Sequence, residues 1–334
     1  MMRMRHGDSR GPSGKRSVFL AVLTALVACG YLYFSFEPVP AGADGKIKLN
    51  HRTRALLASR AGANPASVAN LPLPPAPTTG RGDDVKTAQS ASEADRLAML
   101  MNMALVEQGR RRLAESPDYT CTFFKQERID SEMSDGQLIE LKIRHKPFSV
   151  YMKWLSGDTG REVLYVDGLD DNRMTVHPGG WKARLVPALK LDPDGSLAMR
   201  EARHPVTMVG LAKLCDEIIN RRKIELDRRH PLRCRLIENE VVNGRVCYCF
   251  VSMYLDRKVS EEYRKSIQYI DKEWLLPVCV KNYTWAEAKQ TFADEKALDE
   301  ATLIENYAYS ELQFNQQLAS KDFDRANEAY GFRR

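Results

Sequence analysis

The feature that most constrains the fold is a run of alternating apolar residues that changes phase once, at Lys146-Pro147. Alternation is the period of a half-buried β-strand, whose side chains point to opposite faces in turn. The apolar residues stand first at odd and then at even positions: Ile139, Leu141, Ile143, then Phe148, Val150, Met152 and Trp154. A strand changes its buried face only through an extra residue or a bend, and proline is tolerated at a bulge. The pattern therefore predicts one long, bent strand that curves its sheet.

Neighbouring segments extend this strand into an antiparallel meander. Tyr119–Ile129 is rich in Thr, Phe, Tyr and Cys, and Asp135-Gly136 supplies a turn after it. Glu162–Asp167 and Arg173–His177 predict two further short strands, because glycine and aspartate turns bound them. A curved sheet has a concave side, and what fills that side is the question of function.

The second half of the chain predicts two hairpins and a final strand. Asn243-Gly244 lies between two alternating segments, and this dipeptide is the strongest short-range hairpin pattern. Asp271–Leu275 joins the next pair of segments. The predicted strands are Leu232–Val242, Arg245–Leu255, Tyr263–Ile270, Leu276–Trp285 and Ala301–Phe314.

Two amphipathic helices are predicted beside the sheet. The first begins at Ser92-Glu93-Ala94-Asp95, which has the form of a capping box, and ends near Ser116-Pro117. Thr207–Arg228 predicts the second helix. The irregular stretch Pro178–Pro205 is long for a compact domain, and such loops are usually lids or binding loops. Asp322–Phe332 carries three aromatic residues and is expected to pack back on the body.

The folded part contains six cysteines, an even number that permits disulfides in an exported domain. They are Cys121, Cys215, Cys234, Cys247, Cys249 and Cys279. A two-residue turn at Asn243-Gly244 sets a register with Cys234 opposite Met253. The same register places Cys249 opposite Glu238. We therefore expect small buried side chains with at most one or two disulfides, and no metal site, because no Cys-x-x-Cys pairs occur.

The first 92 residues predict a membrane-targeting segment followed by a linker that tethers the domain. Residues 1–17 are polar and basic, residues 18–36 form an almost unbroken apolar run, and residues 37–92 form a Pro-rich linker expected to be disordered. The apolar run comes close to the ~30 Å thickness of a bilayer core. Because basic residues precede it, a signal anchor would sit in the inner membrane with the domain, residues 93–334, in the periplasm.

Cys29 supports a second interpretation of the same run. Leu26-Val27-Ala28-Cys29 has the form of a bacterial lipobox, whose cysteine is lipidated and becomes the new N-terminus. Tyr31–Phe36 is unusually apolar for the start of a mature lipoprotein, which favours the uncleaved anchor. Simple cleavage is a third interpretation. The first two leave the domain tethered to a membrane.

Motifs for catalysis and for nucleic-acid binding are missing from the sequence. It contains no HExxH, GxSxG or P-loop pattern, and its six histidines are scattered. Cys121 and His145 suggest a thiol–imidazole couple, but a cysteine in mid-strand among Phe and Thr indicates core. The net charge of +6 is spread over both signs, unlike a nucleic-acid surface. We therefore predict no catalytic residue, no enzyme, no cofactor and no nucleic-acid partner.

The segment from about residue 93 to residue 332 resembles an exported bacterial family catalogued as domain of unknown function 1571. The most specific motifs are Arg144–Lys153, Gly160–Val163 and Gly195–Met199. More distantly, the order of elements resembles the periplasmic lipoprotein carrier and its outer-membrane receptor (LolA/LolB-like). There too a helix leads into a strand meander with a basic-Pro-aromatic turn, matched here by Arg144–Phe148. Asp271 and Leu276-Pro277 match a later turn and strand.

The distant resemblance implies an α+β fold: a curved antiparallel sheet, or incomplete β-barrel, with helices packed as a lid over an apolar cavity. In the relatives that cavity binds acyl chains. We therefore predict non-catalytic binding of an acyl chain, lipid or lipidated protein between sheet and lid. The expected lining residues are Phe123, Val150, Met152, Trp154, Tyr165, Met174 and Met199.

An alternative function is a periplasmic sensor or assembly scaffold that binds a partner protein through the curved sheet. The tether fits receptor-like or sensor-like use better than shuttling. A hollow concave side would favour the apolar ligand, and a side filled by large side chains would favour the partner.

Overall fold

The computed structural model describes residues 92–181, 185–227 and 232–333. The predicted basic N-terminus, the apolar run, Cys29 and all but the last residue of the linker lie outside the described residues. Within the described part, no helix combines the length and apolar character needed to cross a membrane.

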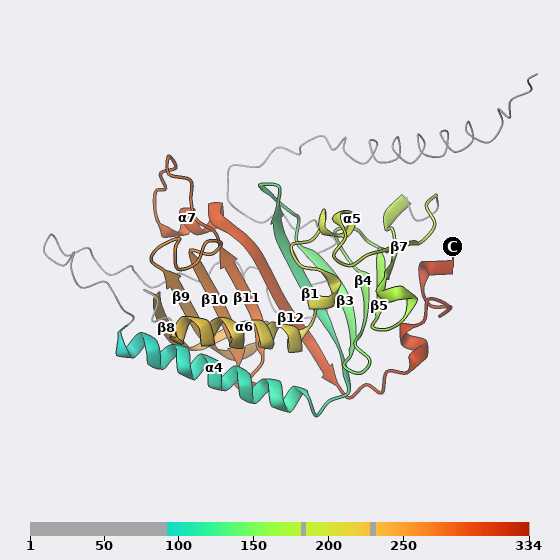
Figure 1. The fold of residues 1–334 in the computed structure, drawn as a ribbon, viewed down its shortest axis with the longest axis horizontal. Coiled ribbons are helices and arrows are strands. Elements are labelled where there is room, and N and C mark those ends of the chain that lie inside the picture. The colour runs from blue at the N-terminus through green and yellow to red at the C-terminus, as the bar shows by residue number, and fades with distance from the viewer. Residues whose placement is uncertain (1–91, 182–184, 228–231, 334) are drawn as a thin grey trace, which may run out of the picture. The chain divides into compact units, whose positions relative to one another are not determined.

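One large antiparallel sheet organises the described chain (Figure 1). Its strands are β1 (Asp118–Ile129), β2 (Glu132–Met133), β3 (Gln137–Arg144), β4 (Ser149–Trp154), β5 (Glu162–Val166), β6 (Met174–His177), β7 (Leu189–Leu191), β8 (Leu232–Val242), β9 (Arg245–Tyr254), β10 (Lys265–Asp271), β11 (Pro277–Tyr283) and β12 (Leu303–Phe314). Their order is β7-β6-β5-β4-β3-β1-β12-β11-β10-β9-β8, and β2 pairs with β1 alone. The sheet is open, with β7 and β8 at its edges. β12 joins the two meanders because it returns to pair with β1 in the centre.

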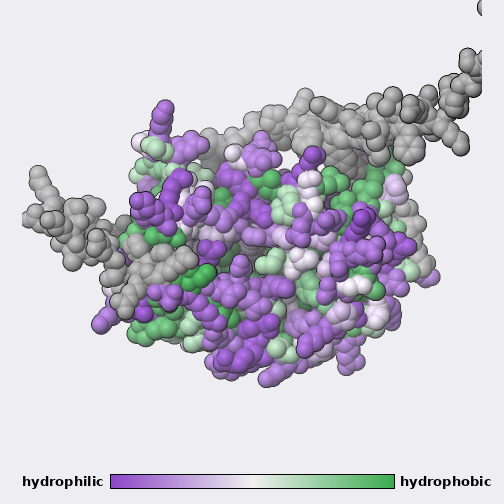
Figure 2. Space-filling model, in the orientation of Figure 1, coloured by the Kyte–Doolittle hydropathy of each residue, from purple (hydrophilic) through white to green (hydrophobic). Residues whose placement is uncertain are grey.

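The α-helices of the described residues are α4 (Glu93–Leu113), α5 (Ser196–Met199), α6 (Leu211–Asp227) and α7 (Glu295–Thr302). α4 begins at the predicted capping box: Asp95 N donates to Ser92 Oγ at 3.2 Å, and Ser92 N donates to Asp95 Oδ2 at 3.1 Å. α4 and α6 lie side by side across the half of the sheet that β8 to β12 form (Figure 1). Hydrophilic side chains cover most of the molecule in this view (Figure 2). The large open antiparallel sheet with a few helices confirms the predicted α+β class.

The predicted long, bent strand is wrong. The chain reverses at residues 145–148, so that β3 and β4 form a hairpin in which Ile143 pairs with Val150 and Ile139 with Trp154. In this register each odd position of β3 faces an even position of β4. The change of phase at Lys146-Pro147 therefore marks a chain reversal and not a bulge within one strand.

The hairpin of β8 and β9 confirms the Asn243-Gly244 turn, but the predicted register fails beyond it. A bulge beside Asn239, whose φ is 65°, adds an unpaired residue to β8. Cys234 consequently lies opposite Ser252 and not Met253. Cys249 lies opposite Ile237 and not Glu238, so both predicted pairs are wrong by one residue. All six cysteines of the described chain are buried and free of disulfides.

The C-terminal tail packs back on the sheet as predicted. Tyr330 stacks on Tyr151 of β4 with ring centroids 3.9 Å apart, and Phe332 meets the same ring edge-on. Because Tyr151 alternates with Val150 and Met152, the tail covers the face of β4 opposite the predicted lining residues. The two faces of this half of the sheet are thus buried by different segments.

Candidate functional site

Six of the seven predicted lining residues share one face of the sheet and one buried hydrophobic cluster. Each of the six is at most 6% exposed: Phe123, Val150, Met152, Trp154, Tyr165 and Met174. They lie on β1, β4, β5 and β6 at every second position, which puts their side chains on the same side. Met199 is separate from them, half-buried in α5. Contact of these residues with a ligand stays a prediction.

Residues 192–208, which we call the lid segment, run from β7 towards α6. Within the segment Pro193 and Val206 are the only buried residues. Val206 belongs to the apolar cluster and Ala198 packs against it, whereas Leu197 remains 54% exposed. The lid segment therefore contributes little apolar burial to the sheet face.

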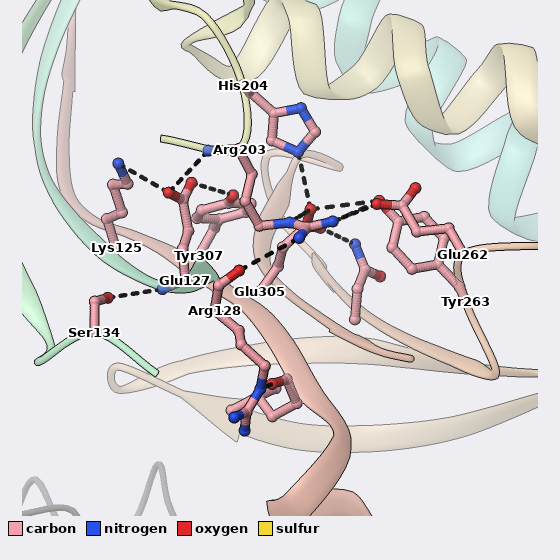
Figure 3. Close-up of polar contacts among 12 residues, drawn as sticks. Lys125, Glu127, Arg128, Ser134, Arg203, His204, Glu262, Tyr263, Glu305 and Tyr307 are labelled. Atoms are coloured by element: carbon pink, nitrogen blue, oxygen red, sulfur yellow. Dashed lines mark hydrogen bonds and ion pairs between the residues drawn. The ribbon is translucent and has the colours of Figure 1, made fainter. Parts of the chain in front are cut away.

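Polar contacts fasten the lid segment to the sheet (Figure 3). Glu127 of β1 and Glu305 of β12 are direct partners across the sheet and are 2% and 1% exposed. Arg203 Nε donates to Glu305 Oε1 at 2.8 Å, and the backbone N–H of Arg203 donates to Glu127 Oε2 at 3.1 Å. His204 Nε2 lies 3.0 Å from Glu305 Oε1. We call these four residues the clasp.

Further donors surround Glu305 on the sheet itself. Asn282 Nδ2 of β11 donates to Oε2 at 2.7 Å, and the Tyr263 hydroxyl lies 3.4 Å from both carboxylate oxygens. Burial raises the pKa of Glu305, but the hydrogen bonds and charges of His204, Asn282 and Arg203 outweigh it and lower the pKa to about 2. Glu305 is therefore an ionised, fully partnered acceptor and has no capacity left to act as a general acid near neutral pH.

Glu127 has a matching set of donors. Lys125 Nζ lies 3.0 Å from Glu127 Oε2, and the hydroxyl of Tyr307 donates to Oε1. Burial and the neighbouring Glu305 and Glu127 raise the pKa of Tyr307, so the hydroxyl stays a donor. Both carboxylates are satisfied, as buried charges in proteins generally are. The geometry is that of a fastening between lid and sheet.

A second fastening joins the lid segment to a predicted lining residue. Arg161 forms an ion pair with Glu201 of the lid segment, and its guanidinium lies over the Trp154 ring, 5.0 Å from the centroid. Lys125 Nζ also donates to the carbonyl oxygen of Glu201 at 3.3 Å. Side-chain and backbone groups of residues 201–204 thus make these polar contacts between the lid segment and the sheet.

We expect the His204→Gln variant to lose stability in a pH-dependent way. The hydrogen bond to Glu305 raises the pKa of His204 above its ordinary value near 6.5, more than burial lowers it. A raised folded-state pKa gives stability that is fully present below the unfolded pKa and is lost as pH rises through the folded one. Urea unfolding at about pH 5.5 and about pH 9 should show a larger deficit of the variant at the lower pH. An equal deficit at both values would contradict this role.

The sequence interpretation missed the clasp. Lys125 and Glu127 continue the odd-numbered apolar phase of Cys121 and Phe123, so their charges fall on the buried face of β1. A charged residue at an alternate position that otherwise carries buried apolar residues is the signal in the sequence that could have identified Lys125 and Glu127. The suggested couple of Cys121 and His145 receives no support: burial raises the pKa of the Cys121 thiol, and His145 Nδ1 donates to the carbonyl oxygen of Ser116 at 2.8 Å.

A family model described as "Protein of unknown function (DUF1571)" matches residues 116–332, which confirms the resemblance carried by the sequence motifs. No curated protein matches the chain.

Solved structures with similarity to the chain include three bacterial proteins. A DUF1329 family protein from Desulfovibrio piger is 13% identical, with a TM-score of 0.35, over 69% of this chain and 98% of that one. Lipoprotein LppX from Mycobacterium tuberculosis is 11% identical, with a TM-score of 0.35, over 70% and 100%. A LolA superfamily protein from Nitrosomonas europaea is 11% identical, with a TM-score of 0.20, over 66% and 96%. Similarity at this level establishes neither a ligand nor an activity.

Proposed function

The chain belongs to the DUF1571 family, and on that premise we propose that it is a non-catalytic binding protein for an apolar ligand. The ligand, an acyl chain, a lipid or a lipidated protein, lies between the lid segment and the apolar face that includes Val150, Met152 and Trp154. The observation that carries the proposal is the difference in polarity between this sheet face and the lid segment. A buried sheet face that is apolar at these positions is packed against a segment that polar and charged contacts hold in place.

The energetics favour exchange of the lid for a ligand. Few apolar side chains of the lid segment are buried, so lifting it loses mainly the burial of the sheet residues beneath it, and its charged groups regain water. A ligand that covers the same face gains about 0.8 kcal/mol for each CH₂ group that it buries. The clasp then determines how often the apolar sheet face becomes accessible, because its charge-assisted hydrogen bonds are stronger than neutral ones.

We expect the Arg203→Gln variant to take up ligand faster than the parent chain. The complete chain in lipid nanodiscs is mixed with a fatty acid that carries a fluorescent group, and the rate of fluorescence change is measured. Loss of the charge-assisted hydrogen bond from Arg203 to Glu305 should increase the uptake rate about ten-fold. Arg200→Gln is the matched control, because Arg200 is exposed on the same lid segment and should leave the rate unchanged.

Native mass spectrometry of the same preparations tests the ligand directly. A species with the mass of an acyl lipid that stays bound to the parent chain supports the proposal. A clean mass of the empty chain, together with no uptake by either the parent or Arg203→Gln, would exclude the apolar ligand. Circular dichroism checks that the variant keeps the fold.

Partner binding is the second candidate function, and one observation favours it. The six predicted lining residues that share the cluster are at most 6% exposed, so side chains fill that face of the sheet. In this case the sheet would act as a rigid scaffold for a sensor or assembly protein. The two experiments above separate the candidates, because a scaffold needs no lid exchange and takes up no fatty acid.

The proposed site sits in a tethered domain. Residues 18–36 as a signal anchor, or Cys29 as a lipidated residue, would hold residues 93–334 at the inner membrane on the periplasmic side. Radiolabelled palmitate incorporation that disappears in Cys29→Ala would identify the lipoprotein form. Membrane retention without any label would identify the anchor.

A further inference from the structure

A cavity of about 270 Å³ lies on the face of the sheet opposite the clasp. It is formed by β5, β6, the turn Asp170–Asn172 and the C-terminal tail. The buried part of its apolar wall consists of Leu164, Val166 and Phe323, which belong to the second hydrophobic cluster and are at most 7% exposed. The apolar ligand proposed above lies on the other face of β5, so this cavity is a separate site.

The charged residues of the cavity divide into two kinds. Asp170 forms an ion pair with Lys190, and the carboxylate of Asp324 accepts from Ala326 N at 2.8 Å and so closes a turn. Among the described residues, Arg173 and Arg325 make no ion pair and no side-chain hydrogen bond. The acidic residues are thus engaged within the protein, and two guanidinium groups remain to meet an anion.

A hydroxyl group adds a third polar element. Thr175 of β6 lines the cavity and is only 4% exposed, yet its hydroxyl makes no hydrogen bond to any described residue. Its hydroxyl oxygen is not fully enclosed by the described residues and is open to solvent. Thr175 can therefore serve a ligand in the cavity as donor or acceptor.

The backbone at the rim is also unusual. Asp170, Asp171 and Asn172 have φ values of 52°, 58° and 57°, three successive left-handed residues without a glycine. After glycine, aspartate and asparagine adopt this conformation most readily, because their short side chains bond to the local backbone; here Asn172 Oδ1 accepts from Gly168 N at 2.8 Å. This turn directly precedes Arg173 and brings it to the rim.

We propose that the cavity binds a small anionic amphiphile. Its anionic head, a carboxylate or a phosphate monoester, lies between Arg173 and Arg325 within reach of the Thr175 hydroxyl. Its short apolar body packs on Leu164, Val166 and Phe323.

Isothermal titration of the complete chain in lipid nanodiscs tests the site, with empty nanodiscs as the reference. The probes are octanoate, octyl phosphate, octanol and inorganic phosphate. We expect octanoate or octyl phosphate to bind with a stoichiometry of one, and the stronger of the two identifies the head group. Octanol lacks the anionic head and inorganic phosphate lacks the apolar body, so both should bind much more weakly.

Three variants assign the binding to the cavity. Arg325→Gln should weaken binding of the anionic probe about ten-fold, because a charge-assisted contact is lost, and Thr175→Val about three-fold. Arg233→Gln is the matched control: Arg233 is exposed on β8, at the far edge of the sheet, and should bind like the parent chain. The proposal is wrong if no probe binds, if octanol binds as tightly as octanoate, or if Arg325→Gln and Thr175→Val bind like the parent chain.

Discussion

The Arg222→Met variant should lose about 3–5 kcal/mol of the free energy of unfolding, because removing one partner of a buried ion pair leaves the other charge uncompensated. Arg222 of α6 is 1% exposed and forms an ion pair with Glu225. It also donates through Nε to Asn102 of α4 at 2.9 Å and through the second terminal nitrogen to Ser252 of β9 at 2.7 Å. One side chain thus joins both long helices to the sheet. Burial lowers the pKa of Arg222, but the charge of Glu225 outweighs it and raises the pKa.

Urea unfolding monitored by circular dichroism measures this loss. Lys223→Met is the matched control, because Lys223 is exposed on the next position of the helix and its ion pair with Glu107 is a surface one. The double variant Arg222→Met/Glu225→Met should recover much of the loss, since it removes both buried charges together. A loss below about 1 kcal/mol in Arg222→Met would show that the pair is not a principal link between the helices and the sheet.

The Gly109→Ala variant should be destabilised even though alanine is the better helix former. A Cβ atom at Gly109 of α4 would lie 2.0 Å from the carbonyl oxygen of Leu275 and 2.5 Å from its carbon. Backbone atoms cannot move aside as a side chain can, so α4 must separate from the turn between β10 and β11. Helix propensity alone would add about 1 kcal/mol of stability, whereas overpacking of this kind removes about 1–3 kcal/mol or more. Because the clash is with backbone atoms at 2.0 Å, we expect the overpacking cost to lie at the upper end of that range and the net loss to be about 2 kcal/mol.

The prediction for Gly109→Ala is tested by the sign of the change in the free energy of unfolding. Gln108→Ala introduces the same residue at the exposed neighbouring position and should change the free energy of unfolding by less than about 0.5 kcal/mol. A Gly109→Ala protein that is as stable as the parent chain, or more so, would mean that α4 does not approach the Leu275 carbonyl so closely in solution.

The misread turn at Lys146-Pro147 shows why a sequence pattern can be right and its interpretation wrong. The change of apolar phase is real, and either a bulge or a chain reversal produces it. Only the pairing of Ile143 with Val150 separates the two, and pairing is a contact between segments. The same limit applies to β8 and β9, where the Asn243-Gly244 turn fixes the register near the loop and the bulge at Asn239 shifts it further out.

The clasp marks a different limit. Arg203 reaches Glu305 across 102 positions of the chain, and Tyr307 reaches Glu127 across 180. No local period connects such residues, because β12 has to return to the centre of the sheet before Glu127 and Glu305 face each other. The charges of β1 on its apolar phase, Lys125 and Glu127, were visible in the sequence and pair with each other, but the cationic groups beside Glu305 of β12 come from the lid segment.

The sequence alone determined the elements that depend on neighbouring residues: the capping box at Ser92, the Asn243-Gly244 turn and the period-two strands that place Val150, Met152 and Trp154 on one face. These follow from local backbone preferences and side-chain alternation, which act within a few residues. The tertiary structure decided which segments cover each face, where β12 inserts, and how buried carboxylates find their partners. Those outcomes depend on long-range packing and on the requirement that every buried charge be compensated, and both are satisfied only once the whole sheet has formed.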